Sequence, residues 1–333
     1  MGAAPSERTV EGMRAITHDD GTLTLRDLPD PEPGPGEVLV EVAAAGVNNA
    51  DRQQVAGNYP PPPGASPVLG LEVSGVVRSL GADVTGWTVG DRVCALLAGG
   101  GYASLVAVPA TQLLPVPDAL DLVSAAALPE AACTVYSNVG MLAGLRPGQT
   151  LLVHGGTGGM GSHAVVWAKA LGATVITTSG GDRKVRASRE LGADLAIDHR
   201  SEDFVAAVHD FTDGRGVDVV LDVVGADYLA GNLQVLAPNG HVAVISTTSG
   251  PKGELDLGAM MAKRATISAT TLRARPLDEK AAIVAAVREH VWPLVEDGSV
   301  RPVVDSVLPL AEAGEAHRRM ADGELIGKVL LTP

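Results

Sequence analysis

Residues 155–161 read Gly-Gly-Thr-Gly-Gly-Met-Gly and contain the GxGxxG spacing between Gly156 and Gly161. Such glycines permit a tight turn that lets the backbone approach a pyrophosphate, and a following helix offers its unpaired N–H groups to the phosphate charge. The spacing alone is a weak signal, because glycine-rich turns also occur for purely steric reasons. Here it lies between a strand-like run at 151–154 and an apolar-periodic stretch at 164–171, and a second strand follows at 174–178. This context predicts a dinucleotide-binding turn.

The end of the second predicted strand bears on the choice of cofactor. Enzymes that prefer NAD usually carry an acid there, which accepts hydrogen bonds from the ribose 2′-hydroxyl. In this chain the segment reads Thr178-Ser179-Gly180-Gly181, and Arg183 and Lys184 follow. Small donors and cations suit a 2′-phosphate, so the sequence favours NADPH over NADH. The alternative is that the two cations only begin a solvated helix face, and Asp182 beside them weakens the electrostatic argument.

Length, charge and cysteine content limit the class of protein. A chain of 333 residues exceeds the roughly 100–200 residues of one domain, and no apolar run reaches the roughly 18 residues of a membrane helix. The formal net charge of −14 disfavours nucleic acid and anionic membranes as partners. Residues 1–11 resemble a loose tail more than a signal peptide, and Cys94 and Cys133 are too few for a disulfide framework or a four-cysteine zinc site. We expect a soluble, cytoplasmic protein with two buried free thiols.

The pattern of the chain changes near residue 130. Before it, short β-type runs such as 37–42 and 73–77 alternate with Pro and Gly clusters, which indicates a small β-rich domain. After it, strands alternate with helical segments, which predicts an α/β fold with a doubly wound parallel sheet. Its six expected strands are 151–154, 174–178, 195–198, 217–222, 241–246 and 266–270.

The last part of the chain is too small to form a domain of its own. It is expected to contain a helix at 276–296, an extended piece at 303–308, a short helix and a closing strand at 328–331. We expect it to return to the first domain, so that 1–129 and 272–333 form a catalytic domain and 130–271 form an inserted dinucleotide-binding domain. The chemistry is then expected in a cleft between the two.

A set of longer motifs is more specific than the glycine turn. These motifs are Gly46-Val47-Asn48-Asn49-Ala50-Asp51, Gly57-Asn58-Tyr59-Pro60, Leu69-Gly70-Leu71-Glu72, Gly90-Asp91-Arg92-Val93, Gly99-Gly100-Gly101-Tyr102-Ala103, Ala127-Leu128-Pro129-Glu130, Leu191-Gly192-Ala193-Asp194, Gly216-Val217-Asp218 and Gly327-Lys328-Val329. Through them the chain after residue 12 resembles the zinc-free quinone oxidoreductases of the medium-chain dehydrogenase/reductase superfamily, in particular the stress-inducible branch. The resemblance implies a Rossmann domain and a GroES-like catalytic domain.

Two positions of this resemblance concern metal. Zinc alcohol dehydrogenases of the superfamily carry a cysteine in the segment that reads Gly46-Val47-Asn48 here, and a histidine in the segment that reads Gly70-Leu71-Glu72. Both ligands are missing, and too few suitable donors remain for a catalytic zinc ion. We therefore expect no metal site.

The resemblance also implies catalytic residues. Asn48 takes the place beside the nicotinamide, where an amide could donate to a developing oxyanion, although Asn also suits a helix start. Asp51 and Arg52 are expected to line or brace the same pocket. Tyr59 lies on the loop that reaches the quinone, where its ring could stack on a flat acceptor; the alternative is a loop aromatic that covers the core.

Most cofactor-binding residues are likewise implied by the resemblance. His199 departs from the family, which commonly has tyrosine there, and exchanges a neutral ring for one that can become cationic. We therefore expect NADPH to bind more tightly as pH falls. For Val224 and Leu272, core packing is the competing interpretation. The implied set is Arg52, Thr134, Tyr136, Gly158, Gly159, Met160, Gly180, Gly181, Lys184, His199, Val224, Ser246, Thr247, Thr270, Thr271, Leu272 and Lys328.

Together these features predict an NADPH-dependent, zinc-independent reductase of quinones or related conjugated carbonyl compounds. One alternative is an enoyl-thioester or alkenal double-bond reductase, which would share the fold and the cofactor. Another is a catalytically weak NADPH-binding sensor. The resemblance further implies a homodimer, in which the strand at 265–270 pairs across a two-fold axis. No dedicated proton donor can be named from the sequence.

Overall fold

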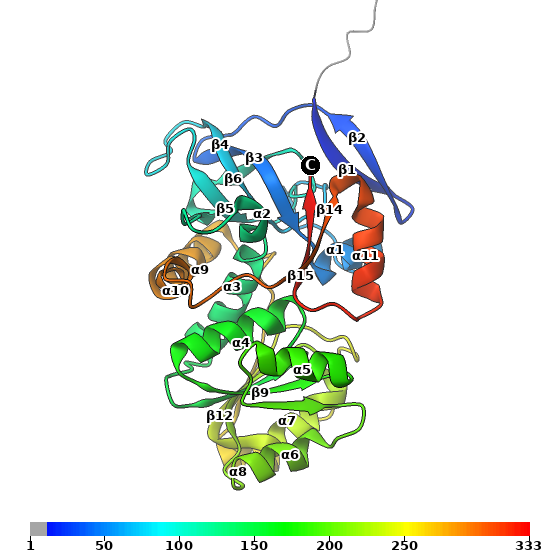
Figure 1. The fold of residues 1–333 in the computed structure, drawn as a ribbon, viewed down its shortest axis with the longest axis vertical. Coiled ribbons are helices and arrows are strands. Elements are labelled where there is room, and N and C mark those ends of the chain that lie inside the picture. The colour runs from blue at the N-terminus through cyan, green and yellow to red at the C-terminus, as the bar shows by residue number, and fades with distance from the viewer. Residues whose placement is uncertain (1–11) are drawn as a thin grey trace, which may run out of the picture.

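The computed structural model of the protein describes residues 12–333, and its two large sheets lie at opposite ends of the molecule (Figure 1). The expected N-terminal tail, residues 1–11, lies outside the described residues. Helices α3 (Pro129–Val135) and α4 (Gly159–Leu171) lie where the two halves meet. No helix of the described part has the length and apolar character that crossing a membrane requires.

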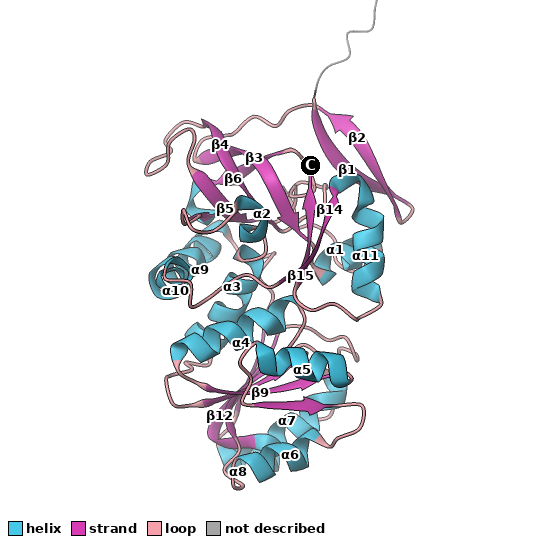
Figure 2. Cartoon of the chain, in the orientation of Figure 1, coloured by secondary structure: helices cyan, strands magenta, loops and turns pink. Residues whose placement is uncertain are grey.

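One half is built on a six-stranded parallel sheet with the order β10-β9-β8-β11-β12-β13. This is the doubly wound order, which reverses direction between β8 and β11, and it confirms the predicted fold class. Figure 2 shows helices packed along this sheet. The strands are β8 (Thr150–His154), β9 (Thr174–Ser179), β10 (Leu195–Asp198), β11 (Val217–Asp222), β12 (Leu236–Val244) and β13 (Thr266–Ala269), and the further helices are α5 (Asp182–Glu190), α6 (Phe204–Phe211), α7 (Leu229–Val235) and α8 (Leu257–Lys263).

The other half is built on a mainly antiparallel sheet of seven strands. Its order is β14-β15-β3-β4-β5-β7, and β6 also pairs with β3. The two last strands of the chain therefore complete a sheet that the early part of the chain begins, with β15 antiparallel to β3. The strands are β3 (Glu37–Gly46), β4 (Glu72–Leu80), β5 (Arg92–Leu96), β6 (Leu105–Pro109), β7 (Leu113–Pro115), β14 (Val304–Pro309) and β15 (Lys328–Thr332).

Smaller elements surround this second sheet. Strands β1 (Met13–Asp19) and β2 (Thr22–Leu28) form a hairpin. The helices around the seven-stranded sheet, or between it and the parallel sheet, are α1 (Asn49–Val55), α2 (Leu122–Ala125), a π-helical segment at Tyr136–Leu142, α9 (Leu277–His290), α10 (Trp292–Glu296) and α11 (Ala313–Ala321). Three 3₁₀ turns complete the chain, at Ala110–Gln112, Ala226–Tyr228 and Leu310–Glu312.

Two expected helix boundaries differ from the structure. The helix expected at 164–171 begins at Gly159, because the glycines of the turn themselves take helical positions after the N-cap Gly158. The single helix expected at 276–296 is divided into α9 and α10 at Val291. Pro293 has no N–H group to donate to a continuous helix, and Trp292 is instead buried, with Nε1 donating to Pro115 O at 2.6 Å.

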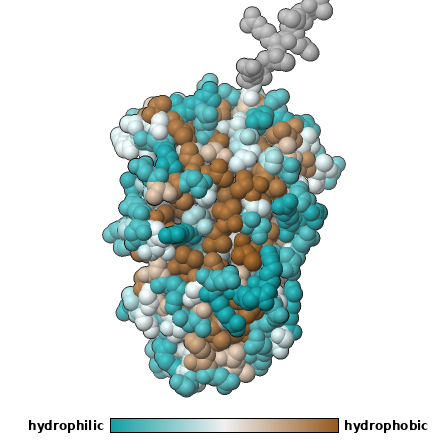
Figure 3. Space-filling view, viewed as in Figure 1, coloured by the Kyte–Doolittle hydropathy of each residue, from teal (hydrophilic) through white to brown (hydrophobic). Residues whose placement is uncertain are grey.

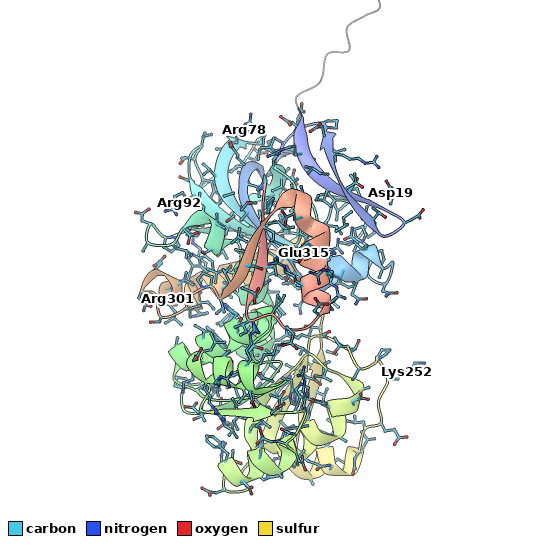
Figure 4. All side chains as sticks on the ribbon, turned by 45° about the vertical axis from the view of Figure 1, so that its right-hand side comes forward. Asp19, Arg78, Arg92, Lys252, Arg301 and Glu315 are labelled. Atoms are coloured by element: carbon cyan, nitrogen blue, oxygen red, sulfur yellow. The ribbon has the colours of Figure 1, made fainter. Side chains whose placement is uncertain are left out.

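The surface combines apolar and charged residues. On the face that Figure 3 shows, apolar residues gather along the middle and hydrophilic residues form the rim. Charged side chains such as Asp19, Arg78 and Lys252 lie at the periphery of the view in Figure 4. Cys94 and Cys133 are buried free thiols, as predicted.

Candidate active site

The ammonium group of Lys328 is the centre of a buried polar cluster where the two halves meet. Lys328 Nζ donates to Asn48 Oδ1 at 2.6 Å and forms an ion pair with Glu72 Oε1. Asn48 Nδ2 in turn donates to Glu72 Oε1 at 2.9 Å and to Gly46 O at 3.4 Å. All three side chains are almost fully buried. Strands β15, β4 and the end of β3 thus hold a fixed cation, a fixed carboxylate and a fixed amide together.

This geometry assigns the hydrogen bonds of Asn48. Both N–H bonds of its amide point at oxygens of Glu72 and Gly46, and its oxygen accepts from Lys328. The amide is therefore fully engaged within the protein. An ammonium carries three N–H donors, of which Lys328 uses two here, so Lys328 retains the donor that was expected of Asn48.

Asp51 fixes the loop that carries Asn48. The two residues form a capping box at the start of α1, in which Asn48 N donates to Asp51 Oδ2 at 2.9 Å. Asp51 also accepts from Gly70 N at 2.9 Å and from Tyr102 Oη at 3.2 Å. Burial raises the pKa of Asp51 to about 6, although these hydrogen bonds and Lys328 oppose the shift. Asp51 is a bracing residue in this structure.

Arg52 points elsewhere than its neighbour. Its guanidinium donates to Asn49 Oδ1 at 3.1 Å, and its side chain lines a surface hollow together with His317 and Arg318. The structure therefore does not bring Arg52 together with the Asn48 cluster.

Tyr59 lies over a buried arginine. The Arg273 guanidinium carbon is 5.5 Å from the centre of the Tyr59 ring, and Arg273 donates to the carbonyl oxygens of Tyr59 and Ala98 and to Gln54 Oε1. These contacts bind the loop after α1 to the chain that enters α9. Burial raises the pKa of Tyr59, and the nearby Glu130 adds to the shift. Tyr59 therefore shares its surroundings with Glu130.

The glycine turn touches the Lys328 cluster directly. A Cβ on Gly159 would lie 3.0 Å from Lys328 Cε, and Gly327 N donates to Thr157 O at 2.8 Å. Within the turn, a Cβ on Gly156 would lie 2.6 Å from Thr177 Cβ, and one on Gly161 would collide with Gly155 O. Only glycine fits at these two positions, and Met160 follows Gly159 in the first turn of α4. The glycine turn and Lys328 are thus neighbours.

A group of cations gathers at the end of β9. A Cβ on Gly180 would lie 2.9 Å from Arg200 Nε and 3.1 Å from His199 Nε2, so both side chains pack over this glycine. Gly181 has a φ of 82°, and its N–H donates to Asp198 Oδ1 at 2.9 Å. Asp198 also accepts from Arg200 N at 3.0 Å, so this carboxylate faces backbone amides. Gly180, Gly181 and His199 therefore lie together at the end of β9, and their role at the adenine-ribose end stays a prediction.

The same cations reach an acidic loop near the C-terminus. Arg183 Nη1 donates to Glu324 O at 2.7 Å, Arg200 pairs with Glu324 Oε1 at 3.4 Å, and Lys184 Nζ donates to Gly323 O. These three side chains are the only cations of the described residues that the Gly323-Glu324 segment contacts by hydrogen bond or ion pair. A 2′-phosphate bound beside Gly180 would meet the same donors, and would compete with this acidic loop for them.

A chain of buried polar groups orders the carboxyl edge of the parallel sheet. Asp222, at the end of β11, accepts from Val224 N at 2.6 Å and Gly225 N at 3.0 Å, and from Asn232 Nδ2 at 3.0 Å. Asn232 Oδ1 is hydrogen-bonded to His154 Nε2 at 2.7 Å, and His154 Nδ1 is hydrogen-bonded to Thr178 Oγ1 at 2.9 Å. Burial lowers the pKa of His154 to about 4. This chain positions Val224 at the edge where a dinucleotide is bound.

The remaining residues that were expected to bind the cofactor lie in several different places. Thr270 Oγ1 donates to Asn138 Oδ1 at 2.7 Å, and Thr134 Oγ1 donates to Glu130 Oε1 at 3.3 Å, so both lie on the junction between the halves. Leu272 is buried in the apolar core, in agreement with the packing alternative. Ser246 and Thr247 lie in the loop after β12, where Thr247 packs against Gly225. The Tyr136 ring packs edge-on against the Trp167 ring. Thr271 O accepts from Arg275 Nε at 2.9 Å.

Several residues of the site escaped the sequence analysis. Glu72 and Glu130 belong to family motifs, but the sequence analysis assigned them no role in the site. Arg200 follows His199 and belongs to no motif. Arg273 has no local signal at all. A buried role for an acid or an arginine depends on partners far away in the chain, which only the fold reveals.

The arrangement fits a nicotinamide dinucleotide. Gly156 and Gly161 allow the tight turn because a Cβ there would collide with Thr177 and Gly155 O. Helix α4 begins at this turn, and cations gather where the adenine ribose would lie. For metal, the described residues contain no group of three or more His, Cys, Asp or Glu side chains that could hold an ion.

Known proteins of similar sequence and structure agree with this architecture. A family model described as "Alcohol dehydrogenase GroES-like domain" matches residues 34–118, and one described as "Zinc-binding dehydrogenase" matches residues 191–331. The chain is 34% identical to a quinone oxidoreductase of Pseudomonas aeruginosa, over 93% of this chain and 95% of the relative. It is 33% identical to a 2-haloacrylate reductase of a Burkholderia species, over 96% of this chain and 99% of the relative.

A solved structure gives the same result. The quinone oxidoreductase of Escherichia coli in complex with NADPH superposes with a TM-score of 0.84 at 28% identity, and the match covers 97% of this chain and 99% of that one. The fold, the glycine turn and these relatives identify an oxidoreductase that uses a nicotinamide cofactor. The chain belongs to the quinone oxidoreductase-like proteins of the medium-chain dehydrogenase/reductase superfamily.

Proposed function

We propose that this protein is an NADPH-dependent, zinc-independent reductase of quinones or related conjugated carbonyl compounds. The observation that carries the proposal is the position of Lys328, whose ammonium is held by Asn48 and Glu72 while its stem lies against Gly159 of the dinucleotide turn. The bound cofactor supplies a hydride. Lys328 supplies a fixed positive donor that can polarise an acceptor carbonyl as negative charge develops on it.

In this proposal each side chain of the cluster has a separate task. Lys328 donates to the acceptor oxygen, Asn48 and Glu72 fix the ammonium, and Asp51 fixes the loop of Asn48. Tyr59, backed by Arg273, offers its ring to a flat acceptor. The tight packing of these groups keeps water away from the reacting atoms.

The preference for NADPH is supported by the cations around Gly180. Arg183, Lys184, His199 and Arg200 all lie on the segments that flank this glycine, and Asp198, the nearest acid at a strand end, binds backbone amides. A 2′-phosphate gains charge-assisted hydrogen bonds from such donors, whereas a 2′-hydroxyl would lack the acid it normally meets.

Independence from zinc is supported by the residues that replace the metal ligands. Asn48 and Leu71 stand where zinc enzymes of the superfamily have cysteine and histidine, and the Lys328 ammonium binds the oxygens of Asn48 and Glu72. A second positive charge in the same cluster would be repelled. Although one matching family model carries zinc in its description, the local chemistry favours a lysine in that role.

Reduction of a conjugated carbon–carbon double bond is the second candidate function. The relative named 2-haloacrylate reductase favours it, and so does the buried Arg273 beside the Tyr59 ring, whose charge would attract an acceptor with an anionic group. The fold and the cofactor would be the same.

We further propose the division of the chain and its assembly. The sheets support domain limits at 129/130 and 271/272, since β8–β13 form one sheet and β3–β7 with β14 and β15 form the other. A homodimer is supported by β13, which ends the order of the parallel sheet, and by the exposed Leu257 and Met261 of the adjacent α8.

An oxidation screen tests the proposed function. The protein is assayed with NADPH and with NADH against quinones, enones, enoyl thioesters and 2-haloacrylates, before and after treatment with a chelator. We expect turnover of quinones or enones with NADPH that the chelator does not reduce. Turnover that requires zinc, or no turnover with any of these acceptors, would contradict the proposal.

A further inference from the structure

Glu130 is a partly buried acid beside the Lys328 cluster, and no cation of residues 12–333 forms an ion pair with it. It is the second residue of α3, and its backbone N donates to Glu72 Oε2 at 3.0 Å. Its Oε1 accepts from Thr134 Oγ1 at 3.3 Å. Its Oε2 is buried and forms no hydrogen bond with residues 12–333. Such an oxygen is rare in a folded protein, and an ionised carboxylate there would be costly.

The balance of charge in the cluster indicates which form Glu130 takes. Three acids, the buried Asp51 and Glu72 and the partly buried Glu130, lie around the Lys328 ammonium, and Lys328 pairs with Glu72. Asp51 is satisfied by backbone amides and by Tyr102. Burial and the charge of Glu72 raise the pKa of Glu130 to about 8, against the opposing effect of Lys328. The Glu130 side chain therefore holds a proton at neutral pH.

The groups on the surrounding elements are consistent with a neutral Glu130. Arg273 and Lys280 direct their hydrogen bonds to carbonyl and amide oxygens, and neither forms an ion pair with Glu130 in the described structure. The charge of Glu130 would also raise the pKa values of Tyr59 and of Cys133. The titratable or charged groups that face Glu130 are Asp51, Tyr59, Glu72, Cys133, Arg273, Lys280 and Lys328.

We propose that Glu130 is the acid that protonates the reduced acceptor, a role that rests on the proposed reductase function. Once a conjugated carbonyl compound has gained a hydride at its β-carbon, the electron pair of its C=C bond forms a double bond between the α-carbon and the carbonyl carbon. The electron pair of the C=O π bond then lies on the enolate oxygen. The Oε2–H bond of Glu130 breaks, its proton forms a new C–H bond at the α-carbon, and the C=O double bond re-forms. For a quinone, the same proton forms the O–H bond of the hydroquinone. The Glu130 carboxylate regains a proton from water.

Infrared spectroscopy of the protein without cofactor tests the protonation itself. The wild-type protein should show the carbonyl stretch of a protonated carboxyl group at neutral pH, and the band should disappear with a midpoint near pH 8. The isosteric variant Glu130→Gln should lack this band. As a matched control, Glu296→Gln changes an exposed glutamate of α10 and should retain it. A spectrum that is identical in wild type and Glu130→Gln would overturn the proposal.

Turnover of an enone in D2O tests the transfer. Wild-type protein should place deuterium on one face of the α-carbon, whereas Glu130→Gln should place it on both faces. The variant should also be slower by about 10²–10⁴-fold, as is typical of a lost general acid, and should lose the alkaline limb of kcat/KM. Glu130→Asp, which keeps an acid, should recover part of that limb.

The outcomes separate this proposal from the proposed function. If wild-type protein reduces no acceptor, both fail, although the infrared test still reports the proton on Glu130. If wild-type protein reduces acceptors while folded Glu130→Gln keeps the rate, the alkaline limb and single-face deuteration, the donor role alone is overturned. Thermal unfolding of each variant confirms that it is folded.

Discussion

Lys328 Nζ lies 2.6 Å from Asn48 Oδ1, although the two residues are 280 positions apart in the chain. The contact joins β15 to the segment that starts α1, and it places the ammonium beside Glu72 and against the dinucleotide turn at Gly159. The Lys328 side chain thus links the C-terminal strand both to the early strands of the seven-stranded sheet and to the dinucleotide turn. Replacing Lys328 should therefore lower the stability and the activity of the protein by separate mechanisms.

Replacing Lys328 should reveal the cost of an unpaired buried acid. In Lys328→Met, Glu72 stays fully buried without its cation, so the free energy of unfolding should fall by roughly 3–5 kcal/mol. The double variant Lys328→Met/Glu72→Gln should recover much of this stability but not the reductase activity. Denaturant unfolding and an NADPH oxidation assay measure the two effects. The exposed Lys252→Met is the control, and equal stability of the two single variants would refute the argument.

The cations near Gly180 should discriminate between the two nicotinamide cofactors. Arg200→Ala removes a donor beside the expected 2′-phosphate, so the Kd for NADPH should rise roughly ten- to hundredfold, the range for lost hydrogen bonds to charged groups. The Kd for NADH should stay the same. Fluorescence titration at two salt concentrations measures both constants. Arg78→Ala, which changes an exposed arginine of β4, serves as the control; equal losses for NADPH and NADH would contradict the assignment.

Glu324 should lower the affinity for NADPH, whereas Arg200 should raise it. Its carboxylate pairs with Arg200, and its carbonyl oxygen accepts from Arg183. Because a 2′-phosphate would compete with this carboxylate, Glu324→Gln should bind NADPH several-fold more tightly and leave NADH binding unchanged. The same titration measures the change. Weaker NADPH binding would indicate instead that Glu324 orders the cations for the cofactor.

The sequence was informative wherever the signal was local. The six strands of the parallel sheet, the glycine turn and the acid-free end of β9 follow from runs and spacings within a few residues. The contacts of Lys328, Glu130 and Glu324 do not, because each depends on a partner that the fold brings from far along the chain. The helix break at Val291 was missed although Pro293 marks it, since the apolar pattern continues across it. Asn48 was expected to donate to the acceptor, and only the observed hydrogen bonds show that its amide is engaged.

The proposed homodimer should depend on the exposed residues beside β13. Leu257 and Met261 of α8 are 65% and 78% exposed and lie one helical turn apart, so together they present an apolar surface that a partner can cover. The double variant Leu257→Lys/Met261→Lys should therefore shift the mass measured by light scattering from dimer to monomer. Leu80→Lys, at the far sheet, should not. A dimer that survives the double variant would place the interface elsewhere.

His154 should make the protein sensitive to acid. Burial lowers its pKa to about 4, whereas a histidine in an unfolded chain titrates near about 6.5. Between about pH 6.5 and about pH 4 the unfolded state therefore binds a proton at His154 that the folded state does not bind. The stabilisation by neutral His154 is complete above about pH 6.5 and is lost as pH falls toward 4. His163 and His317, whose pKa values burial also lowers to about 4, act in the same sense.

The contribution of His154 is isolated by comparing His154→Gln with wild type, because Asp51 and Glu130 titrate in the same range. Burial raises their pKa values to about 6 and about 8, so these two acids favour the folded state at low pH and oppose the histidines. At pH 7 the variant should lose about 1–3 kcal/mol, since Asn232 and Thr178 lose a partner. Between pH 6.5 and pH 4 the loss should shrink by about 1.4 kcal/mol per pH unit. Denaturant unfolding across this range measures it, and the exposed His290→Gln should follow wild type throughout; a difference that stays constant with pH would show that His154 is not neutral in the fold.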